Sequence, residues 1–359
     1  MPQNDGGSPL MLASQNGQIE VVKLLLDKGA NTNLRAKTNG KTALIQASST
    51  GHTEIVRLLL EHGAKMDMQQ NDGASPLILA SQNGQLDVAK LLLDKGANTN
   101  LQTKDGGNAL IVASQIGQTE IVRLLLDKGA NVDIQATDGR TALYMASQNG
   151  HSEIVKLLLD KGGSLDLKDK TKGTTHLMIA SANGHAEVVK LLLDKGANKD
   201  AQATNGWSAL MLSSEKGYIE IVKLLLDKGA KLDLMESNGF TALSNASDNG
   251  YIEIVKLLLD KGAKLDLQDK YGYTALIGAT ENGYTEIVKL LLDKGANVNL
   301  QRTDGATALI MASHKGQTEV VKSLLRKGAN PTLKSGEGKT ALDYAKNTEI
   351  KTLLTNYNK

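Results

Sequence analysis

Glycine recurs along the whole chain at a nearly constant interval. Eleven glycines open eleven similar segments: Gly6, Gly40, Gly73, Gly106, Gly139, Gly173, Gly206, Gly239, Gly272, Gly305 and Gly338. Every step is 33 residues, except for the two steps of 34 residues that end at Gly40 and Gly173. A unit of this length cannot bury its apolar face alone, so neighbouring units must stack against one another. The sequence therefore predicts a linear stack of eleven units.

Each unit is predicted to contain two short helices, as the copy at residues 139–168 illustrates. Thr141 is a suitable N-cap for a helix that continues through Ser147. Gly150 interrupts the chain, and a second helix follows over residues 152–159, with apolar residues on both of its sides. The residues from its end to the next opening glycine are predicted to form a turn and a loop.

A helix, a tight turn, a second helix and a protruding turn at this period resemble the ankyrin repeat, whose signature is T-P-L-H-x-A. Residues 8–13 and 75–80 match five positions of that signature, and the second-helix pattern of residues 220–226 recurs almost unchanged. The resemblance covers the whole chain. It implies an all-α repeat solenoid in which residues 1–359 form one domain of eleven stacked ankyrin-type repeats, the last of them a C-terminal cap.

The copies depart from the ankyrin signature in two ways. The histidine at the fourth position is absent from every copy, and the proline remains only at Pro9 and Pro76. The Thr–His hydrogen bonds that are usual in the family are therefore not expected. Burial of leucine side chains supplies most of the stability of such a stack, so the fold itself is still expected.

The first and last units differ in polarity. In the last unit the turn between the helices is shortened, and Lys351 and Thr355 stand where earlier copies carry valine and leucine. A solenoid needs such a polar cap at its end. The first unit is as apolar as an interior one, which favours a chain that is part of a longer protein.

The charge balance argues against nucleic acid and membranes as partners. Lys and Arg number 41 and Asp and Glu number 39, which gives a net charge of +2 and no uniform field. Residues 1–5 do not begin an export signal, and no apolar run is long enough to span a membrane. The chain has no cysteine, in agreement with a reducing compartment. A cytoplasmic location is therefore expected.

No pattern of residues indicates catalysis or a cofactor. The glycines follow the repeat and do not form a phosphate-binding loop before Lys-Ser or Lys-Thr. Three histidines, His52, His151 and His185, follow the helix–helix glycine, where the ankyrin pattern favours histidine as support for the turn rather than as a metal ligand. The chain is therefore predicted to have no catalytic residue, cofactor or metal, and not to be an enzyme.

A residue shared by all copies, such as Asp94, Asp127 or Asp160 at the end of the second helix, explains stacking and not specificity. The position after each opening glycine differs between copies, and the resemblance places it at the protruding turn that faces a partner. It holds the only tryptophan and the only phenylalanine of the chain, followed by a tyrosine, in three adjacent copies: Trp207, Phe240 and Tyr273. Large rings at exposed turns are predicted to bind a partner, with lateral packing as the alternative.

Acidic residues accompany these rings in the same copies. Glu215, Asp248 and Glu281 lie two residues before the helix–helix glycine, where the preceding copies carry neutral residues. Asn245 and Gly278 replace an aliphatic residue of the first helix, which either deepens a groove or reflects drift at a half-exposed position.

The predicted partner-binding set is Trp207, Phe240, Tyr273, Tyr271, Glu215, Asp248, Glu281 and Asn245. Three further tyrosines occupy the turn position of His52 and are interpreted as structural: Tyr218, Tyr251 and Tyr284.

These features predict a monomeric, non-catalytic scaffold that binds a protein or an extended peptide on its concave face. Rings beside carboxylates suit a cation with an apolar stem, so the partner is expected to contain Arg or Lys. Two alternatives stay open. The similarity of the copies also fits an engineered or consensus-like ankyrin scaffold, and the chain could be the interaction module of a larger protein whose activity lies elsewhere.

Overall fold

The structure, a computed structural model, describes residues 6–357. It divides into two units, Met1–Ala197 (unit 1) and Asn198–Lys359 (unit 2). Residues 1–5, in which no export signal was found, lie outside the described part. The prediction that residues 1–359 form one continuous domain stays a prediction.

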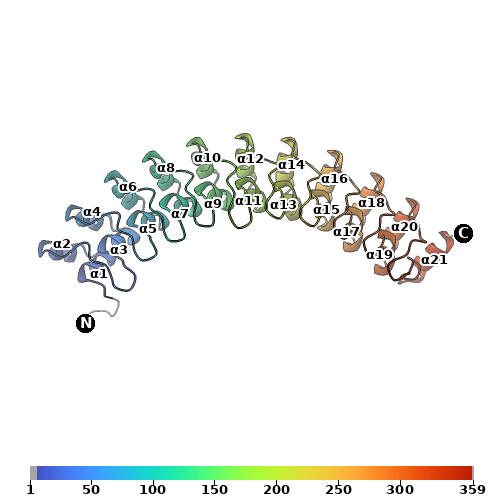
Figure 1. Cartoon of the computed structure of the whole chain (residues 1–359), viewed down its shortest axis with the longest axis horizontal. Coiled ribbons are helices and arrows are strands. Elements are labelled where there is room, and N and C mark those ends of the chain that lie inside the picture. The colour runs from blue at the N-terminus through green and yellow to red at the C-terminus, as the bar shows by residue number, and fades with distance from the viewer. Residues whose placement is uncertain (1–5, 358–359) are drawn as a thin grey trace. The chain divides into compact units, whose positions relative to one another are not determined.

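The described residues of unit 1 form six helix pairs, with the first helices of the pairs in one row and the second helices in another (Figure 1). The first helices are α1 (Pro9–Gln15), α3 (Ala43–Thr50), α5 (Pro76–Gln82), α7 (Ala109–Ile116), α9 (Ala142–Asn149) and α11 (His176–Ala182). The second helices are α2 (Ile19–Asp27), α4 (Thr53–Glu61), α6 (Leu86–Asp94), α8 (Thr119–Asp127), α10 (Ser152–Asp160) and α12 (Ala186–Asp194). Each first helix packs against its own second helix, and each from α1 to α9 also packs against the first helix of the next pair.

Unit 2 repeats this arrangement with four helix pairs and a final single helix in its described residues. The first helices are α13 (Ala209–Lys216), α15 (Ala242–Asp248), α17 (Ala275–Asn282) and α19 (Ala308–Lys315). The second helices are α14 (Ile219–Asp227), α16 (Ile252–Asp260), α18 (Thr285–Asp293) and α20 (Thr318–Arg326), and α21 (Thr348–Tyr357) packs against α20. Helix pairs therefore build both units, as the all-α solenoid prediction requires.

The residue before each odd-numbered helix from α1 to α19 explains where that helix begins. Thr141 precedes α9, and its hydroxyl accepts a hydrogen bond from the Tyr144 N–H at 3.1 Å. A Ser, Thr or Asn side chain makes the same bond in the other nine first helices. Gly150 ends α9 in the left-handed conformation at φ 75°, which favours glycine. The predicted start at Thr141 is confirmed, and the helix ends two residues beyond Ser147.

The core of each unit lies between its two rows of helices. In the pair α9–α10, Leu143 and Ala146 of the first helix and Ile154, Val155 and Leu158 of the second are fully buried. Each buried Val, Leu or Ile side chain stabilises the folded state by roughly 1.5–3 kcal/mol. Corresponding side chains are buried in the other pairs of helices, except in α1–α2, where Val21 is 44% exposed and Leu25 is half-buried. Small aliphatic residues thus hold the repeats together.

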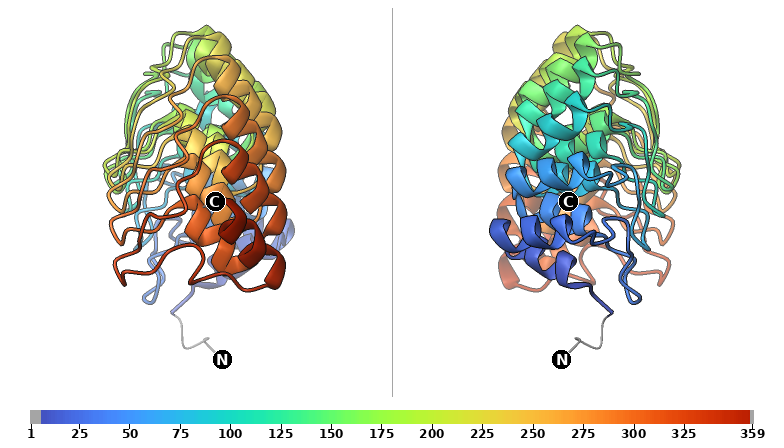
Figure 2. Two further views of the ribbon diagram at one scale, coloured as in Figure 1. Left: turned by 90° about the vertical axis from the view of Figure 1, so that its right-hand side faces the viewer. Right: turned by 90° about the vertical axis from the view of Figure 1, so that its left-hand side faces the viewer.

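Loops project from one side of the helix pairs in each unit (Figure 2). Backbone hydrogen bonds join neighbouring loops: Lys104 donates to Asp72 at 2.7 Å in unit 1, and Lys270 donates to Asn238 at 2.8 Å in unit 2. The described residues form no β-strand, and the loops contain only isolated bridges. These bonds keep successive loops at the spacing of the helices that they connect.

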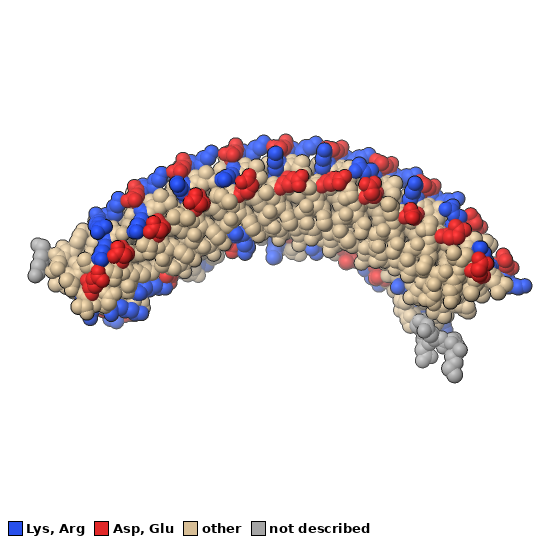
Figure 3. All heavy atoms as spheres, turned by 180° about the vertical axis from the view of Figure 1, so that it is seen from behind, with Lys and Arg blue, Asp and Glu red and all other residues tan. Residues whose placement is uncertain are grey.

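Oppositely charged side chains link the second helices of neighbouring repeats. Lys128 pairs with Asp94 and Lys161 pairs with Asp127, both at 3.0 Å, and Lys294 pairs with Asp260 at 2.8 Å. Figure 3 shows positive and negative side chains alternating along this side of each unit. The partners are exposed, so each pair contributes little to stability. The shared aspartates belong to the stacking of repeats, as predicted.

One Thr–His hydrogen bond forms against expectation, from the position that the signature gives to proline. His176 is 1% exposed, and its Nε2 lies 3.1 Å from the Thr141 hydroxyl of the preceding repeat. Its Nδ1 lies 2.6 Å from the carbonyl oxygen of Leu165. Burial lowers the pKa of His176, so the ring is neutral at pH 7 and acts as a structural bridge.

The last repeat departs from the pair of helices. Residues 341–344 form a turn in place of a first helix. Asp343 closes this turn, because its carboxylate accepts hydrogen bonds from the N–H and the hydroxyl of Thr340, both at 2.8 Å. In α21, Lys351 and Thr355 are exposed, whereas Ile350 and Leu354 are buried. This distribution agrees with the predicted polar cap.

Candidate functional site

We call the surface formed by the loops and the odd-numbered helices the loop–helix surface. In unit 2, Trp207, Phe240 and Tyr273 occupy the same place in three consecutive loops. The carbonyl oxygen of each accepts a hydrogen bond from the residue four positions earlier, at 2.9, 3.1 and 3.0 Å respectively. The loops therefore present these three side chains at equivalent positions in successive repeats.

The three rings are half-buried rather than fully exposed. Each lies in a loop whose backbone is joined to the next loop, as in the 2.9 Å hydrogen bond from Ser237 to Asn205. Close stacking of the loops leaves less room for a ring than an isolated turn would, so each ring also packs laterally in part, which the sequence analysis kept as the alternative. Part of each ring remains accessible to a partner.

Tyr271 lies two residues before Tyr273, near the tip of the same loop. Its side chain is 51% exposed, and the Lys270 ammonium group lies 4.9 Å from the centre of its ring. The Tyr271 N–H donates to Asp269 at 2.8 Å, which holds the loop in place while the ring points away from the core.

The three predicted acids lie toward the C-terminal ends of α13, α15 and α17. Glu215 is half-buried and pairs with Lys216 at 3.6 Å. Glu281 lies close enough to the Tyr273 hydroxyl to act on its ionisation, which brings together one ring and one acid of the predicted set. Burial, followed by the interaction with the Glu281 carboxylate, raises the pKa of Tyr273 to about 12.

Asp248 occupies the space that a side chain at Gly278 would need. A Cβ atom added to Gly278 would overlap the Oδ1 atom of Asp248. Because Gly278 has no side chain, the Asp248 carboxylate of the preceding repeat fills this space. The glycine therefore does not simply deepen a groove. Burial and the negative charges of Glu281 and Asp269 raise the pKa of Asp248 to about 7.

Asn245, predicted to touch a partner, is 7% exposed. Its Nδ2 atom is buried and has no hydrogen-bond partner among residues 6–357. Asn245 lies one turn before Asp248 on α15 and is polar at a position where most other repeats have an aliphatic residue.

Asp269 and Glu236 are buried acids that sequence reasoning missed. Each precedes the aromatic residue by four positions and accepts its backbone N–H, at 2.8 Å for Tyr273 and 3.2 Å for Phe240. Comparing the copies could have found them, because this position varies and holds Ala136, Ala203 and Arg302 in other repeats.

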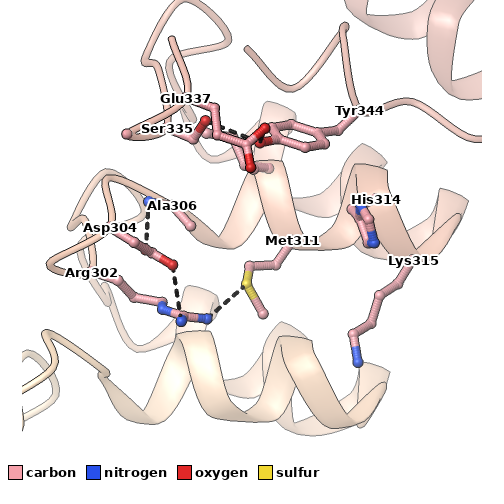
Figure 4. A pocket seen from close by; sticks show the side chains of 11 residues that line it. Arg302, Asp304, Ala306, Met311, His314, Lys315, Ser335, Glu337 and Tyr344 are labelled. Atoms are coloured by element: carbon pink, nitrogen blue, oxygen red, sulfur yellow. Dashed lines mark hydrogen bonds and ion pairs between the residues drawn. The ribbon is translucent and has the colours of Figure 1, made fainter. Parts of the chain in front are cut away.

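Arg302 shows how a cation fits on this surface. Its guanidinium carbon lies 4.3 Å from the centre of the Tyr273 ring, and it pairs with Asp304 at 3.0 Å. The side chain also borders a pocket of about 330 Å³, which Met311, His314, Lys315 and Tyr344 help to line (Figure 4). The C-terminal ends of α13, α15 and α17 thus carry acidic side chains, whereas that of α19 carries His314 and Lys315.

The turn positions after the helix–helix glycines are structural, as predicted. His151 and His185 place Nε2 3.2 and 3.0 Å from the carbonyl oxygens of Gln115 and Gln148 in the preceding repeats. In unit 2, the Tyr251 ring lies so close to Gly217 that a side chain there would overlap it, and Tyr284 lies in the same way against Gly250.

Two classes of site are not found in the described part of the chain. Residues 6–357 contain no group of three His, Cys, Asp or Glu side chains placed to hold a metal ion. None of their helices has the length and apolar character that crossing a membrane requires.

Stacked helix pairs with linked loops define a helical-repeat protein. Models of ankyrin repeats (3 copies) match residues 10–103, 77–169, 161–236 and 229–302, and a model of ankyrin repeats (many copies) matches residues 291–345. The chain belongs to the ankyrin-repeat family. Ankyrin repeats are typically modules of protein–protein interaction without catalytic activity, so this family indicates a protein partner.

Among solved structures, the chain is similar to the ankyrin repeat domain of Bcl-3, which is described as a unique member of the IkappaB protein family. The two are 34% identical with a TM-score of 0.54, over 61% of this chain and 99% of that one. No curated protein matches the chain.

Proposed function

We propose that unit 2 binds an extended basic segment of a partner protein on its loop–helix surface. One observation carries this proposal. Three rings at equivalent loop positions, Trp207, Phe240 and Tyr273, coincide with three carboxylates, Glu215, Asp248 and Glu281, in the same three repeats. An arginine or lysine can lay its stem along a ring while its charge meets an acid.

The spacing of the repeats suggests the form of the segment. Packed helices lie about 8 to 10 Å apart, and an extended chain advances about 3.3 Å per residue. Basic residues of the partner are therefore expected about three positions apart. A peptide of this kind would meet one ring and one acid in each repeat.

Contacts within unit 2 support the choice of a cation. Arg302 lies over Tyr273 at 4.3 Å, so this ring already accommodates a guanidinium group of its own chain. Glu281 acts on the ionisation of Tyr273, which supports a site in which one ligand side chain meets this ring and this acid together. The half-burial of the rings reduces the area on offer below the roughly 150 to 250 Å² of a whole large aromatic side chain.

Fluorescence anisotropy with a synthetic peptide tests the proposal. The probe is an alanine peptide with an arginine at about every third position, and a matched peptide carries glutamate in place of arginine. The full chain should bind the basic peptide and not the acidic one. Replacing Trp207, Phe240 and Tyr273 together with alanine should weaken binding by about 30-fold or more, equal to about 2 kcal/mol.

The matched control is Lys41→Ala, at the same loop position in unit 1, and it should leave binding unchanged. Preference for the acidic peptide, or normal binding by the triple variant, would show that the site assignment is wrong.

A further inference from the structure

The carboxylate of Asp248 lies in a place that most repeats fill with an aliphatic side chain. Gly278 lies within α17 and has no positive φ, so its backbone does not require glycine. What excludes a larger residue is Asp248, whose Oδ1 a Cβ atom would overlap. The corresponding place between α19 and the last repeat holds two rings, with His314 and Tyr344 at 5.7 Å. Asp248 and Gly278 occupy the two positions that His314 and Tyr344 hold there. A glycine opposite an acid is specific to the junction between α15 and α17.

Two carboxylate oxygens at this junction have no hydrogen-bond donor among residues 6–357. Asp269 is 8% exposed, and its Oδ1 accepts the N–H groups of Tyr271 and Tyr273, both at 2.8 Å. Its Oδ2 atom is buried and lacks a partner in the described part of the chain, as does the Oδ1 atom of Asp248. Buried acceptors of this kind are costly unless a donor meets them.

The charged groups around Asp248 are acidic. Asp269 approaches it from the loop and Glu281 from α17, and both raise its pKa. On α13, which packs against α15, Glu215 is engaged by Lys216. The buried residues of α16 are apolar. Arg302 is directed to the Tyr273 ring, Asp304 and Met311 and supplies no hydrogen bond to these acids.

The arrangement suits an organic cation better than a metal ion. These acids do not come together as a metal-binding group in the described residues. A guanidinium group has five N–H donors in a planar fork and can bridge carboxylates that lie too far apart to share a small ion. Arg302 already lies over the Tyr273 ring at 4.3 Å, so the charge of the ligand side chain falls to the carboxylates.

We propose that Asp248, Asp269 and Glu281 form a receptor for a single arginine or lysine side chain of the partner, with Gly278 making room for the Asp248 carboxylate. This inference rests on the proposed function and names its main anchor. Because Asp248 has a pKa of about 7, a proton competes with the ligand cation. Binding therefore tightens as the pH rises through neutrality and Asp248 ionises.

The test measures the affinity of the arginine–alanine peptide at pH values of about 6 and about 8. If the cation needs ionised Asp248, the affinity of the full chain should rise up to about tenfold over this range. Asp248→Asn should bind more weakly and show no such rise. The variant keeps His314 and every other titratable group, so the difference isolates Asp248. Replacing the arginines by neutral citrulline, one at a time, should remove the rise at one position only.

Gly278→Ala provides a second variant, because it keeps the charge of Asp248 but displaces the carboxylate. It should behave as Asp248→Asn does. The matched control is Gly107→Ala in unit 1, another glycine without positive φ, which should leave binding unchanged. If either variant fails to fold, carboxyl-carbon NMR on the unmodified chain replaces it, and the peptide should lower the titration midpoint of Asp248.

The outcomes separate the two proposals. A peptide that binds equally well at both pH values, a pH dependence that survives in Asp248→Asn, or an unchanged Asp248 midpoint would overturn the receptor while the proposed function stands. Failure of the full chain to bind the peptide at either pH would overturn both.

Discussion

Unit 1 and unit 2 share one framework but carry different loop–helix surfaces. In unit 1, Gln115 and Gln148 stand where unit 2 has Asp248 and Glu281. Arg140 occupies the ring position in unit 1 and pairs with Asp138 of its own loop, beside a pocket of about 390 Å³. The hydrogen bond and charge of Arg140 lower the pKa of Asp138 below its ordinary value, so this charge is balanced internally.

Unit 2 leaves part of its charge unbalanced. Among the described residues, the buried carboxylate oxygens without a donor belong to Asp248 and Asp269, both in unit 2. An acid whose pKa is raised by burial and by neighbouring negative charges destabilises the folded state at neutral pH. A buried acid with a perturbed pKa is a candidate functional group, which supports the assignment of binding to unit 2.

The largest expected effect concerns stability. The pKa of Asp248 rises from 3.8 to about 7 on folding. Between these values the unfolded chain loses a proton that the folded chain keeps, so the free energy of unfolding falls by about 1.4 kcal/mol per pH unit as the pH increases. Asp248→Asn removes this loss. Urea unfolding should show the variant more stable by up to about 4 kcal/mol at a pH of about 8, with little difference near pH 4.

The matched change in unit 1 is Gln115→Asn, which removes no charge and should alter stability equally at both pH values. A stabilisation by Asp248→Asn that does not depend on pH would show that the acid is not held neutral in the fold.

The next effect concerns binding of the basic peptide. Trp207→Ala should weaken it by about 2 kcal/mol or more if the ring is a hot spot, because truncation removes the stem contact of a basic side chain. Arg140→Ala, at the same loop position in unit 1, should have little effect. Titration calorimetry on the full chain gives both values. Equal losses would remove the distinction between the two surfaces.

A smaller effect tests the shared framework. The hydroxyls of Thr42 in unit 1 and Thr274 in unit 2 each accept a backbone N–H at 3.2 Å and begin a helix. Replacing either by alanine should cost about 1 kcal/mol in the free energy of unfolding. Urea unfolding should give similar losses in both units, and a loss confined to one unit would indicate that their frameworks differ.

Much of the framework could be predicted because the same local pattern occurs in every copy of the repeat. The second helix expected over residues 152–159 is α10, Ser152–Asp160. Thr141 caps its helix, and Lys351 and Thr355 are exposed, since capping and amphipathic spacing are local properties that a single copy displays. The turn at residues 341–344 was not predicted, because the bonds from Thr340 to Asp343 replace helical ones.

Most of the candidate site depends on contacts between copies. Asp248 meets the space at Gly278 only when two repeats stack, and the two residues lie 30 positions apart. The half-burial of the three rings has the same origin in linked loops. Comparison of the copies could identify Trp207 and Asp248 as variable, but not the buried neighbours that give Asp248 its chemistry.

The smallest expected effect is kinetic. Glu215→Gln, Asp248→Asn and Glu281→Gln together should slow association with the basic peptide and reduce its dependence on salt, because electrostatic steering acts mainly on the association rate. Stopped-flow measurements at low and high salt give both quantities. Neutral Gln82, Gln115 and Gln148 of unit 1 can be replaced by alanine as the control, with no change expected in the salt dependence.

The location of the bound peptide tests the assignment of binding to unit 2 most directly. A photoreactive group at the centre of the arginine–alanine peptide is cross-linked to the full chain, and the modified residues are identified by mass spectrometry. Adducts should lie within residues 205–282 and should disappear in the presence of excess unlabelled peptide. Competed adducts concentrated on the loops of unit 1, residues 70–140, would contradict the assignment.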